Sequence, residues 1–131
     1  MEFDHIGIFV ESLVVGREHL GSIFGIKKWE KPVVDSIQGV KVQFGYDSKG
    51  ICYEIVAPNA KVNPVDNVLK QAKNILNHVA YKVDDIYLEI KRLQESDSIL
   101  ISGPVESAAF NNKKISFLYT PLKFVIELIE K

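Results

Sequence analysis

Two histidines and two glutamates recur at matched positions in this chain, and these residue types could together bind a metal ion. His78 follows His5 at the same sequence separation at which Glu127 follows Glu54. Imidazole and carboxylate ligands suit divalent first-row metals. We therefore expect the four residues to meet at one site. The alternative explanation is that the chain is internally duplicated and that each copy retains a His–Glu pair with a purely structural role.

Each glutamate sits in a strongly apolar segment that is typical of a β-strand. The segments are Ile51-Cys52-Tyr53-Glu54-Ile55-Val56 and Phe124-Val125-Ile126-Glu127-Leu128-Ile129. A carboxylate buried there without a partner would cost several kcal/mol. A metal ion is the obvious compensation.

Alternation along the strands separates the predicted ligands from the predicted core. Successive side chains of a strand point to opposite faces. His5 should therefore face away from Ile6, Ile8 and Val10, which we expect to pack on the first helix. By the same rule Glu127 should face away from Ile126 and Leu128.

The same separation relates other segments along the whole chain and indicates an internal duplication. The segment Asn77-His78-Val79-Ala80-Tyr81-Lys82-Val83-Asp84 echoes Asp4-His5-Ile6-Gly7-Ile8-Phe9-Val10-Glu11. We predict an α+β fold in which two tandem βαβββ modules form one curved mixed sheet with a metal-binding cleft. The domain would span 1–131, with modules over 3–58 and 76–131 and a linker over 59–75.

Local signals place the elements of each module. Ser12 and Asp85 are predicted helix caps, each followed by apolar residues at helical spacing. Asn63-Pro64 predicts a short helix over about 64–73 in the linker. The predicted strands are 3–10, 27–34, 39–46 and 51–57, then 78–83, 99–107, 114–119 and 123–130.

Composition excludes several classes of function. The 131 residues carry a net charge of −1, so there is no electrostatic case for a nucleic-acid partner. No apolar run reaches the roughly 20 residues of a membrane span, so no membrane partner is expected. The first residues are acidic rather than basic, and Cys52 is the only cysteine. These features favour a cytoplasmic protein.

The duplicated pattern and its motifs resemble the vicinal oxygen chelate superfamily over essentially the whole chain. The stretch from Asn77 to Ile86 is most similar to methylmalonyl-CoA epimerase, and Glu54-Ile55-Val56-Ala57-Pro58 also matches that enzyme. The resemblance implies metal ligands at His5, Glu54, His78 and Glu127. It further implies one divalent ion (Co, Ni, Mn, Zn or Fe) and a homodimer.

The resemblance also implies a chemistry. The metal would stabilise charge on substrate oxygens while a carboxylate moves the proton next to a thioester or hemithioacetal carbon. We predict Glu127 as metal ligand and base, with Glu54 opposite it as the second catalytic group. The substrate would be an acyl-CoA, or another thioester or hemithioacetal. The enzyme would be an epimerase-like isomerase or lyase.

One departure from the epimerase pattern favours the alternative of a glyoxalase I-like enzyme. The epimerase carries a catalytic glutamate on its third strand, but that position falls on Val42 here, with Gln43 beside it. A one-residue shift in register would decide which of the two faces the site. Glu54 also stands where the epimerase usually has glutamine and where glyoxalase I has glutamate.

Two further alternatives are an extradiol dioxygenase and a small-molecule binding or resistance protein. The dioxygenase needs additional catalytic histidine and tyrosine residues, and the only spare histidine is His19, which we expect on the surface of the first helix. Binding proteins of this kind often lack the metal ligands, whereas this chain keeps all four. Cys52 has no second cysteine and is expected to be a half-buried filler.

Overall fold

The computed structural model describes residues 1–73 and 75–131 and has an α+β architecture, as predicted. The first half of the molecule contains β1 (Glu2–Phe9), α1 (Leu13–Phe24), β2 (Lys28–Trp29), β3 (Val33–Asp35), β4 (Val40–Tyr46) and β5 (Cys52–Pro58). After α2 (Val65–Gln71), the second half contains β6 (Leu76–Val83), α3 (Ile86–Glu95), β7 (Ile99–Ser107), the 3-10 turn η1 (Ala108–Phe110), β8 (Lys113–Tyr119) and β9 (Val125–Glu130). The exact module limits stay a prediction.

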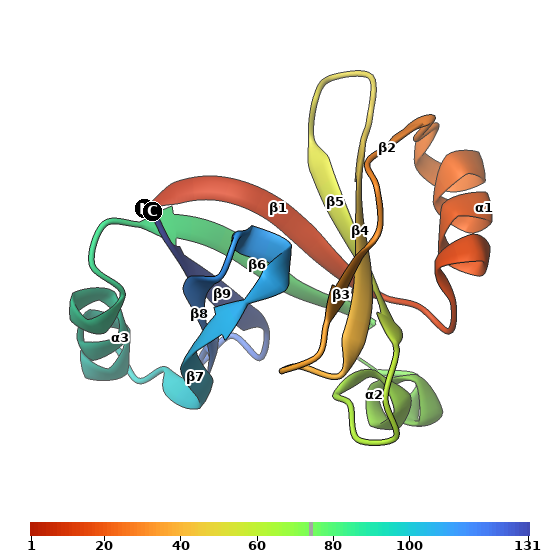
Figure 1. Ribbon diagram of the computed structural model, residues 1–131. Helices are drawn as coiled ribbons and strands as arrows, with labels where there is room; N and C mark the ends of the chain where they lie inside the picture. Colours follow the sequence, from red (N-terminus) through yellow and green to blue (C-terminus); the bar gives the residue numbers. More distant parts are fainter. Residues whose placement is uncertain (74) are drawn as a thin grey trace.

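All strands join one mixed sheet, and its two halves meet at β1 and β6. The order is β2-β4-β5-β1-β6-β9-β8-β7, and β3 also pairs with β4. β5 is parallel to β1, β9 is parallel to β6, and β1 and β6 are antiparallel. The sheet curves, with α1 and α3 at opposite ends of the molecule (Figure 1). This arrangement confirms the predicted curved sheet built from a repeated unit.

The first helix begins and ends where its sequence signals predict. The Ser12 hydroxyl accepts a hydrogen bond from the backbone N–H of Val15, at 3.2 Å. Gly25 ends the helix in the left-handed region, with φ of 68°, which a residue without Cβ adopts at little cost. The helix packs Leu13 and Leu20 into a core cluster with Ile8 of β1.

The second half repeats this arrangement with α3. Asp85 caps the helix by accepting from the N–H of Leu88, at 3.0 Å. The helix buries Ile86, Ile90 and Leu93 against β9, where Ile126 and Leu128 belong to the same cluster. The alternation predicted for β1 and β9 is confirmed, because Ile6 and Ile8 pack on α1 and Ile126 and Leu128 pack on α3. His5 and Glu127 are therefore left on the opposite, concave face of the sheet.

The predicted strand over 27–34 is wrong as a single element. It is two short strands, β2 and β3, which both pair with β4. Pro32 lies between them and has no N–H to donate to the ladder. The break directs Asp35 at the end of β3 toward the second half of the molecule.

The connection between the halves contains the predicted short helix, α2. The side-chain oxygen of Asn63 accepts hydrogen bonds from the N–H groups of Val65 and Asp66, at 2.9 and 3.0 Å. Val65 is fully buried in a cluster with Val40 and Val56, so α2 covers one end of the first half-sheet. Among the residues described, no helix has the length and apolar character needed to cross a bilayer.

Candidate metal centre and its cleft

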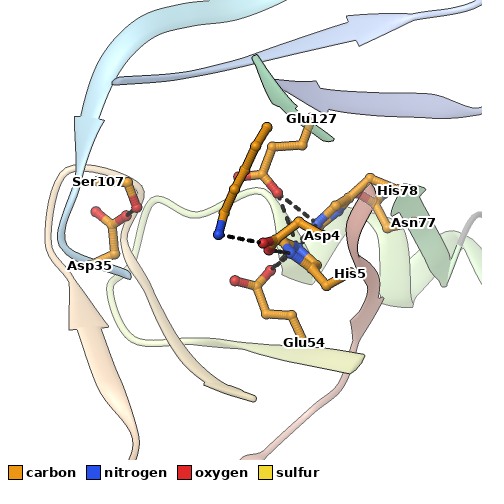
Figure 2. Close-up of polar contacts among 9 residues, drawn as sticks. Asp4, His5, Asp35, Glu54, Asn77, His78, Ser107 and Glu127 are labelled. Carbon is orange, nitrogen blue, oxygen red and sulfur yellow. Dashed lines mark hydrogen bonds and ion pairs between the residues drawn. The ribbon is translucent and has the colours of Figure 1, made fainter. Parts of the chain in front are cut away.

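The four predicted ligands converge on one point of the concave face. His5, Glu54, His78 and Glu127 each offer a ligand atom, and these atoms lie within 4.8 Å of one another. The two Nε2 atoms are 3.3 Å apart. An oxygen of Glu127 lies 3.2 Å from each of them. An oxygen of Glu54 lies 3.5 Å from His5 and 3.4 Å from His78 (Figure 2).

Strand pairing explains this convergence. β1 and β6 lie side by side, with Gly7 opposite His78 and His5 opposite Ala80. Glu54 lies on β5, where it pairs with Gly7 of β1. Glu127 lies on β9, where it pairs with Ala80 of β6. Glu54 therefore lies beside Gly7, which faces His78 of the second half. Glu127 lies beside Ala80, which faces His5 of the first half.

Gly7 leaves the space that the His78 ring occupies. A Cβ on Gly7 would overlap three ring atoms of His78. The backbone of Gly7 needs no unusual dihedral angle, so the requirement for glycine is steric alone. The sequence analysis assigned Gly7 no role at the candidate site, although a glycine in an apolar strand is a visible signal of close packing.

Polar neighbours orient both imidazole rings. Nδ1 of His5 lies 2.8 Å from Oδ2 of Asp4, and Nδ1 of His78 lies 3.0 Å from the side-chain oxygen of Asn77. An acceptor at Nδ1 holds the ring proton there and leaves the Nε2 lone pair for a metal. Asp4 and Asn77 each immediately precede a predicted ligand, and the sequence analysis assigned them no role.

The residues present fit a divalent metal ion. Ligand atoms about 2.0–2.1 Å from a tetrahedral Zn²⁺ lie about 3.3–3.4 Å from one another, close to the distances between these side chains. Oε2 of Glu127 is buried and accepts no well-directed hydrogen bond from the described residues. Two carboxylates and two imidazoles that are at most 4% exposed are otherwise costly to bury.

The charges of the cluster shift its pKa values strongly. Burial opposes the charged form of His5, but the nearby Glu54 and Asp4 raise its pKa well above the usual value. Burial likewise opposes protonation of His78, yet the adjacent carboxylates of Glu127 and Glu54 raise its pKa. Burial favours the neutral form of Glu54, but the two histidines lower its pKa. Without a metal, these shifts favour the protonated imidazoles of His5 and His78 and the charged carboxylate of Glu54.

Aromatic side chains form the walls around the two imidazoles. The ring of Phe110 stacks on His5 with centroids 5.8 Å apart, and Phe44 meets His5 edge-on. Phe9 and Phe117 meet His78 edge-on. These walls keep water from the outer faces of the ligands, which strengthens electrostatic interactions inside the site.

A cavity of about 200 Å³ opens beside the cluster, and Glu54, His78 and Glu127 border it. Val42 faces this cavity. Gln43 points to the other side of the sheet, where it accepts a hydrogen bond from Arg17 at 2.7 Å and donates one to the backbone oxygen of Glu30. The register of β4 therefore turns Val42 and not Gln43 to the site, and this strand presents no carboxylate to the cavity.

A buried hydrogen bond ties the two halves together at the edge of the cavity. The Ser107 hydroxyl donates to Oδ2 of Asp35 at 2.6 Å, and both residues are at most 2% exposed. Figure 2 shows this pair apart from the four-residue cluster. The bond joins the end of β3 to the end of β7, next to the turn that carries Phe110. No sequence pattern indicated this contact, since the two residues are not related by the repeat.

The remaining candidates lie where the sequence analysis expected them. His19 is exposed on α1. Cys52 is half-buried, and burial raises the pKa of its thiol to about 11, so it is a poor nucleophile at neutral pH.

The fold and the matched sequence define the class of this protein. The chain belongs to the Glyoxalase/Bleomycin resistance protein/Dioxygenase superfamily, whose family model matches residues 4–130. This match confirms the predicted superfamily. A comparison with curated proteins finds no match.

Several solved structures share the fold over nearly the full chain. A hypothetical protein from Bacillus halodurans C-125 is 25% identical, with a TM-score of 0.80 over 99% of this chain and 94% of that one. Methylmalonyl-CoA epimerase from Mycobacterium tuberculosis is 21% identical, with a TM-score of 0.77 over 98% and 87%. The Streptomyces coelicolor epimerase in complex with 2-nitronate-propionyl-CoA is 20% identical, with a TM-score of 0.75 over 100% and 97%.

Proposed function

We propose that this chain is a metal-dependent isomerase or lyase that moves a proton next to the carbonyl of a thioester or hemithioacetal. The observation that carries the proposal is the buried oxygen of Glu127, which lies 3.2 Å from both imidazoles. It receives no well-directed hydrogen bond from the described residues, and Glu127 borders the cavity. Such an oxygen is suited both to a metal and to a proton. The similarity to methylmalonyl-CoA epimerases supports the same chemistry.

Each residue of the cluster has a role in this proposal. His5, Glu54, His78 and Glu127 would hold one divalent ion of Co, Ni, Mn, Zn or Fe. When bound, the ion would act as a Lewis acid toward the substrate carbonyl oxygen and so make the adjacent C–H more acidic. Glu127 would take the proton at its carboxylate and return it, and Glu54 would serve a second face of the substrate carbon. We further propose a homodimer located in the cytoplasm.

Two observations favour the glyoxalase I-like alternative over a strict epimerase. Val42 rather than a glutamate faces the cavity from β4. Glu54 is buried in the cluster where the epimerase usually has glutamine. A small-molecule binding protein and an extradiol-type dioxygenase remain alternatives to be separated by experiment. Of the described residues bordering the cavity, His78 is the only histidine, which disfavours the dioxygenase.

Metal content and proton exchange test the proposal. Wild-type protein should bind about one divalent ion per chain, and His5→Ala should lower the affinity by more than the roughly 10- to 100-fold that loss of an outer-shell partner costs. Metal-loaded protein in deuterated water should exchange the α-proton of a 2-substituted acyl thioester, or isomerise a 2-oxoaldehyde hemithioacetal. Glu127→Gln should slow this reaction by about 100- to 10,000-fold.

Controls separate the candidate functions. Glu18→Gln removes an exposed carboxylate on α1 and should leave exchange unchanged. Glu54→Gln restores the epimerase-type ligand set, so a variant still active on acyl-CoA favours the epimerase. Loss of activity on both substrate types favours the glyoxalase arrangement. No exchange with any of the metals would contradict proton transfer and favour the binding protein or the dioxygenase.

A further inference from the structure

Two cavities of the molecule share the turn η1 as a wall. The first is the cavity of about 200 Å³ beside the four-residue cluster. The second has a volume of about 280 Å³ and is bordered by Asp4, Glu30, Phe44, Tyr46, Gly50, Cys52, Ala109 and Phe110. Of the residues that the structure describes, Ala109 and Phe110 alone border both cavities. These two residues therefore separate the two spaces.

The ring of Phe110 makes up most of this wall, since Ala109 contributes only a methyl group. It stacks on His5, with centroids 5.8 Å apart and an angle of 14° between the rings. It also meets Phe44 edge-on, with centroids 5.8 Å apart. His5 is completely buried and borders neither cavity. Phe110 thus bounds the first cavity directly beside a predicted metal ligand.

The backbone of the turn holds Phe110 in place independently of its ring. Ser107, which precedes η1, donates its hydroxyl to the buried Asp35, and its backbone oxygen accepts from the N–H of Asn112 at 2.9 Å. Asn111 and Asn112 have φ of 54° and 61°, in the left-handed region that asparagine adopts more readily than most residues. Truncation of the Phe110 ring should therefore empty the space that the ring fills while the turn stays in place.

The two cavities differ in the chemistry of their walls. The first is mostly apolar, with side chains from both halves such as Val42, Val56 and Ile115. The second is bordered by polar side chains, which include two carboxylates, a phenol hydroxyl and a thiol. A substrate group that lies beside the cluster and extends toward η1 meets the ring of Phe110. To pass it, the group would have to displace the ring from its stacking contact with His5, at a cost in free energy.

We infer that Phe110 is a specificity-determining residue, whose ring limits the size of the substrate group that the first cavity accepts. The inference rests on the proposed function and deepens it, because it narrows the substrate class of the same site. The wild-type protein would take a thioester or hemithioacetal that has one compact apolar group next to the carbonyl. A branched or bulkier group would need a smaller side chain in place of Phe110. The ring contacts His5 and no reacting atom, so its role is selective rather than catalytic.

Two hydroxamates test the inference by binding rather than by turnover. On the carbon next to the carbonyl, 3-phenylpropanohydroxamate carries one benzyl group and 2-benzyl-3-phenylpropanohydroxamate carries two, while their metal-binding oxygens are the same. Metal-loaded wild-type protein, titrated by calorimetry, should bind the one-benzyl probe at least about tenfold more tightly, because the second group overfills the cavity. In Phe110→Ala the second benzyl group should occupy the space of the deleted ring. Its burial should raise the relative affinity for the two-benzyl probe by at least about tenfold.

Further variants show whether the size of the side chain is the cause. Phe110→Leu keeps part of the wall and should shift the ratio of affinities less than Phe110→Ala. Phe124→Ala removes a ring that is 39% exposed and borders neither cavity, so it is the matched control and should keep the wild-type ratio. Metal content should be unchanged in all three variants, since none of them removes a predicted ligand. Should Phe110→Ala not fold, Phe110→Val takes its place, with a shift in the same direction.

The outcomes distinguish the inference from the proposed function. Equal binding of the two probes by loaded wild-type protein would overturn the inference, as would failure of the one-benzyl probe to bind. An unchanged ratio in Phe110→Ala, or an equal shift in Phe124→Ala, would overturn it as well. The proton-transfer proposal would stand in each of these cases. Failure of the wild-type protein to take up metal would instead contradict the proposed function, and the inference would fall with it.

Discussion

The two halves of the molecule present the same ligand types from equivalent strands, but they support the two histidines differently. His5 is held by the Asp4 carboxylate, which in turn pairs with Lys82 of the other half at 3.2 Å. His78 is held by the neutral side-chain oxygen of Asn77. A carboxylate makes an imidazole a stronger base than an amide does. The Nε2 atoms of His5 and His78 therefore differ in basicity, although they lie at equivalent positions of the repeated backbone.

The space around the two rings differs as well. His78 lies over Gly7, whereas His5 is paired with Ala80, whose methyl group is fully buried. His5 is covered by Phe110 from the second half and is completely buried. The repeated backbone therefore places the predicted ligands at equivalent positions, whereas the residues that orient and cover them differ between the two halves.

The largest expected effect comes from exchanging the small residues opposite the histidines. Gly7→Ala should displace the His78 ring, destabilise the fold by about 1–3 kcal/mol through overpacking, and abolish tight metal binding. Ala80→Gly removes a buried methyl group and should cost about 1 kcal/mol with metal affinity nearly kept. Thermal unfolding and metal titration measure both. Equal loss of metal in the two variants would refute the steric role of Gly7.

The next effect concerns Asp4 and Asn77, which orient His5 and His78 through their Nδ1 atoms. Asp4→Asn should weaken metal binding by about 10- to 100-fold, because the imidazole of His5 becomes a less basic metal ligand. Asn77→Asp should strengthen metal binding. Lys82→Gln serves as the control for loss of the Asp4–Lys82 ion pair, which is partly exposed and worth little. If Lys82→Gln weakens binding as much as Asp4→Asn, the contact of Asp4 with His5 is not the cause.

The bond between the halves should contribute to stability rather than to the metal site. Ser107→Ala leaves a buried oxygen of Asp35 without its donor and should lower the free energy of unfolding by about 1–3 kcal/mol. Ser36→Ala, at an exposed position next to Asp35, should change it little. Urea unfolding measures both. A Ser107→Ala variant as stable as Ser36→Ala would show that the two halves do not depend on this contact.

The smallest expected effect is the pH dependence of the metal-free protein. The pKa values of His5 and His78 are raised in the folded state, so their contribution to stability is complete below the unfolded value of about 6.5 and is lost as the pH rises through the raised values. Bound metal needs deprotonated imidazoles, so the loaded protein should not lose stability over this range.

Melting temperatures with and without a chelator, between neutral and alkaline pH, measure this difference. Both pKa values are raised, so His5→Gln and His78→Gln should each remove part of the pH dependence. Equal pH profiles for the chelator-treated and the loaded wild-type protein would contradict the prediction.

Local residue patterns were sufficient to predict much of this protein. Ser12 and Asp85 precede the segments with helical spacing. Each side chain accepts a hydrogen bond from a backbone N–H three residues later, so the cap depends on local sequence alone. Alternation along β1 and β9 follows from strand geometry, so it assigned His5 and Glu127 to the concave face. The repeat, with its constant sequence separation, then predicted that four distant side chains share one site, because equivalent strands meet around a pseudo-symmetric centre.

Other features depended on the tertiary structure, since they result from contacts between segments that no local pattern relates. Strand pairing decided that Val42 and not Gln43 faces the cavity, because a shift of one residue would exchange them. The break at Pro32 carries Asp35 to Ser107, and the antiparallel pairing of β1 with β6 puts Gly7 beneath His78. Packing of η1 against the first half decided that Phe110 covers His5. The sequence determined which residues could bind a metal, and the pairing of β1 with β6 decided what surrounds them.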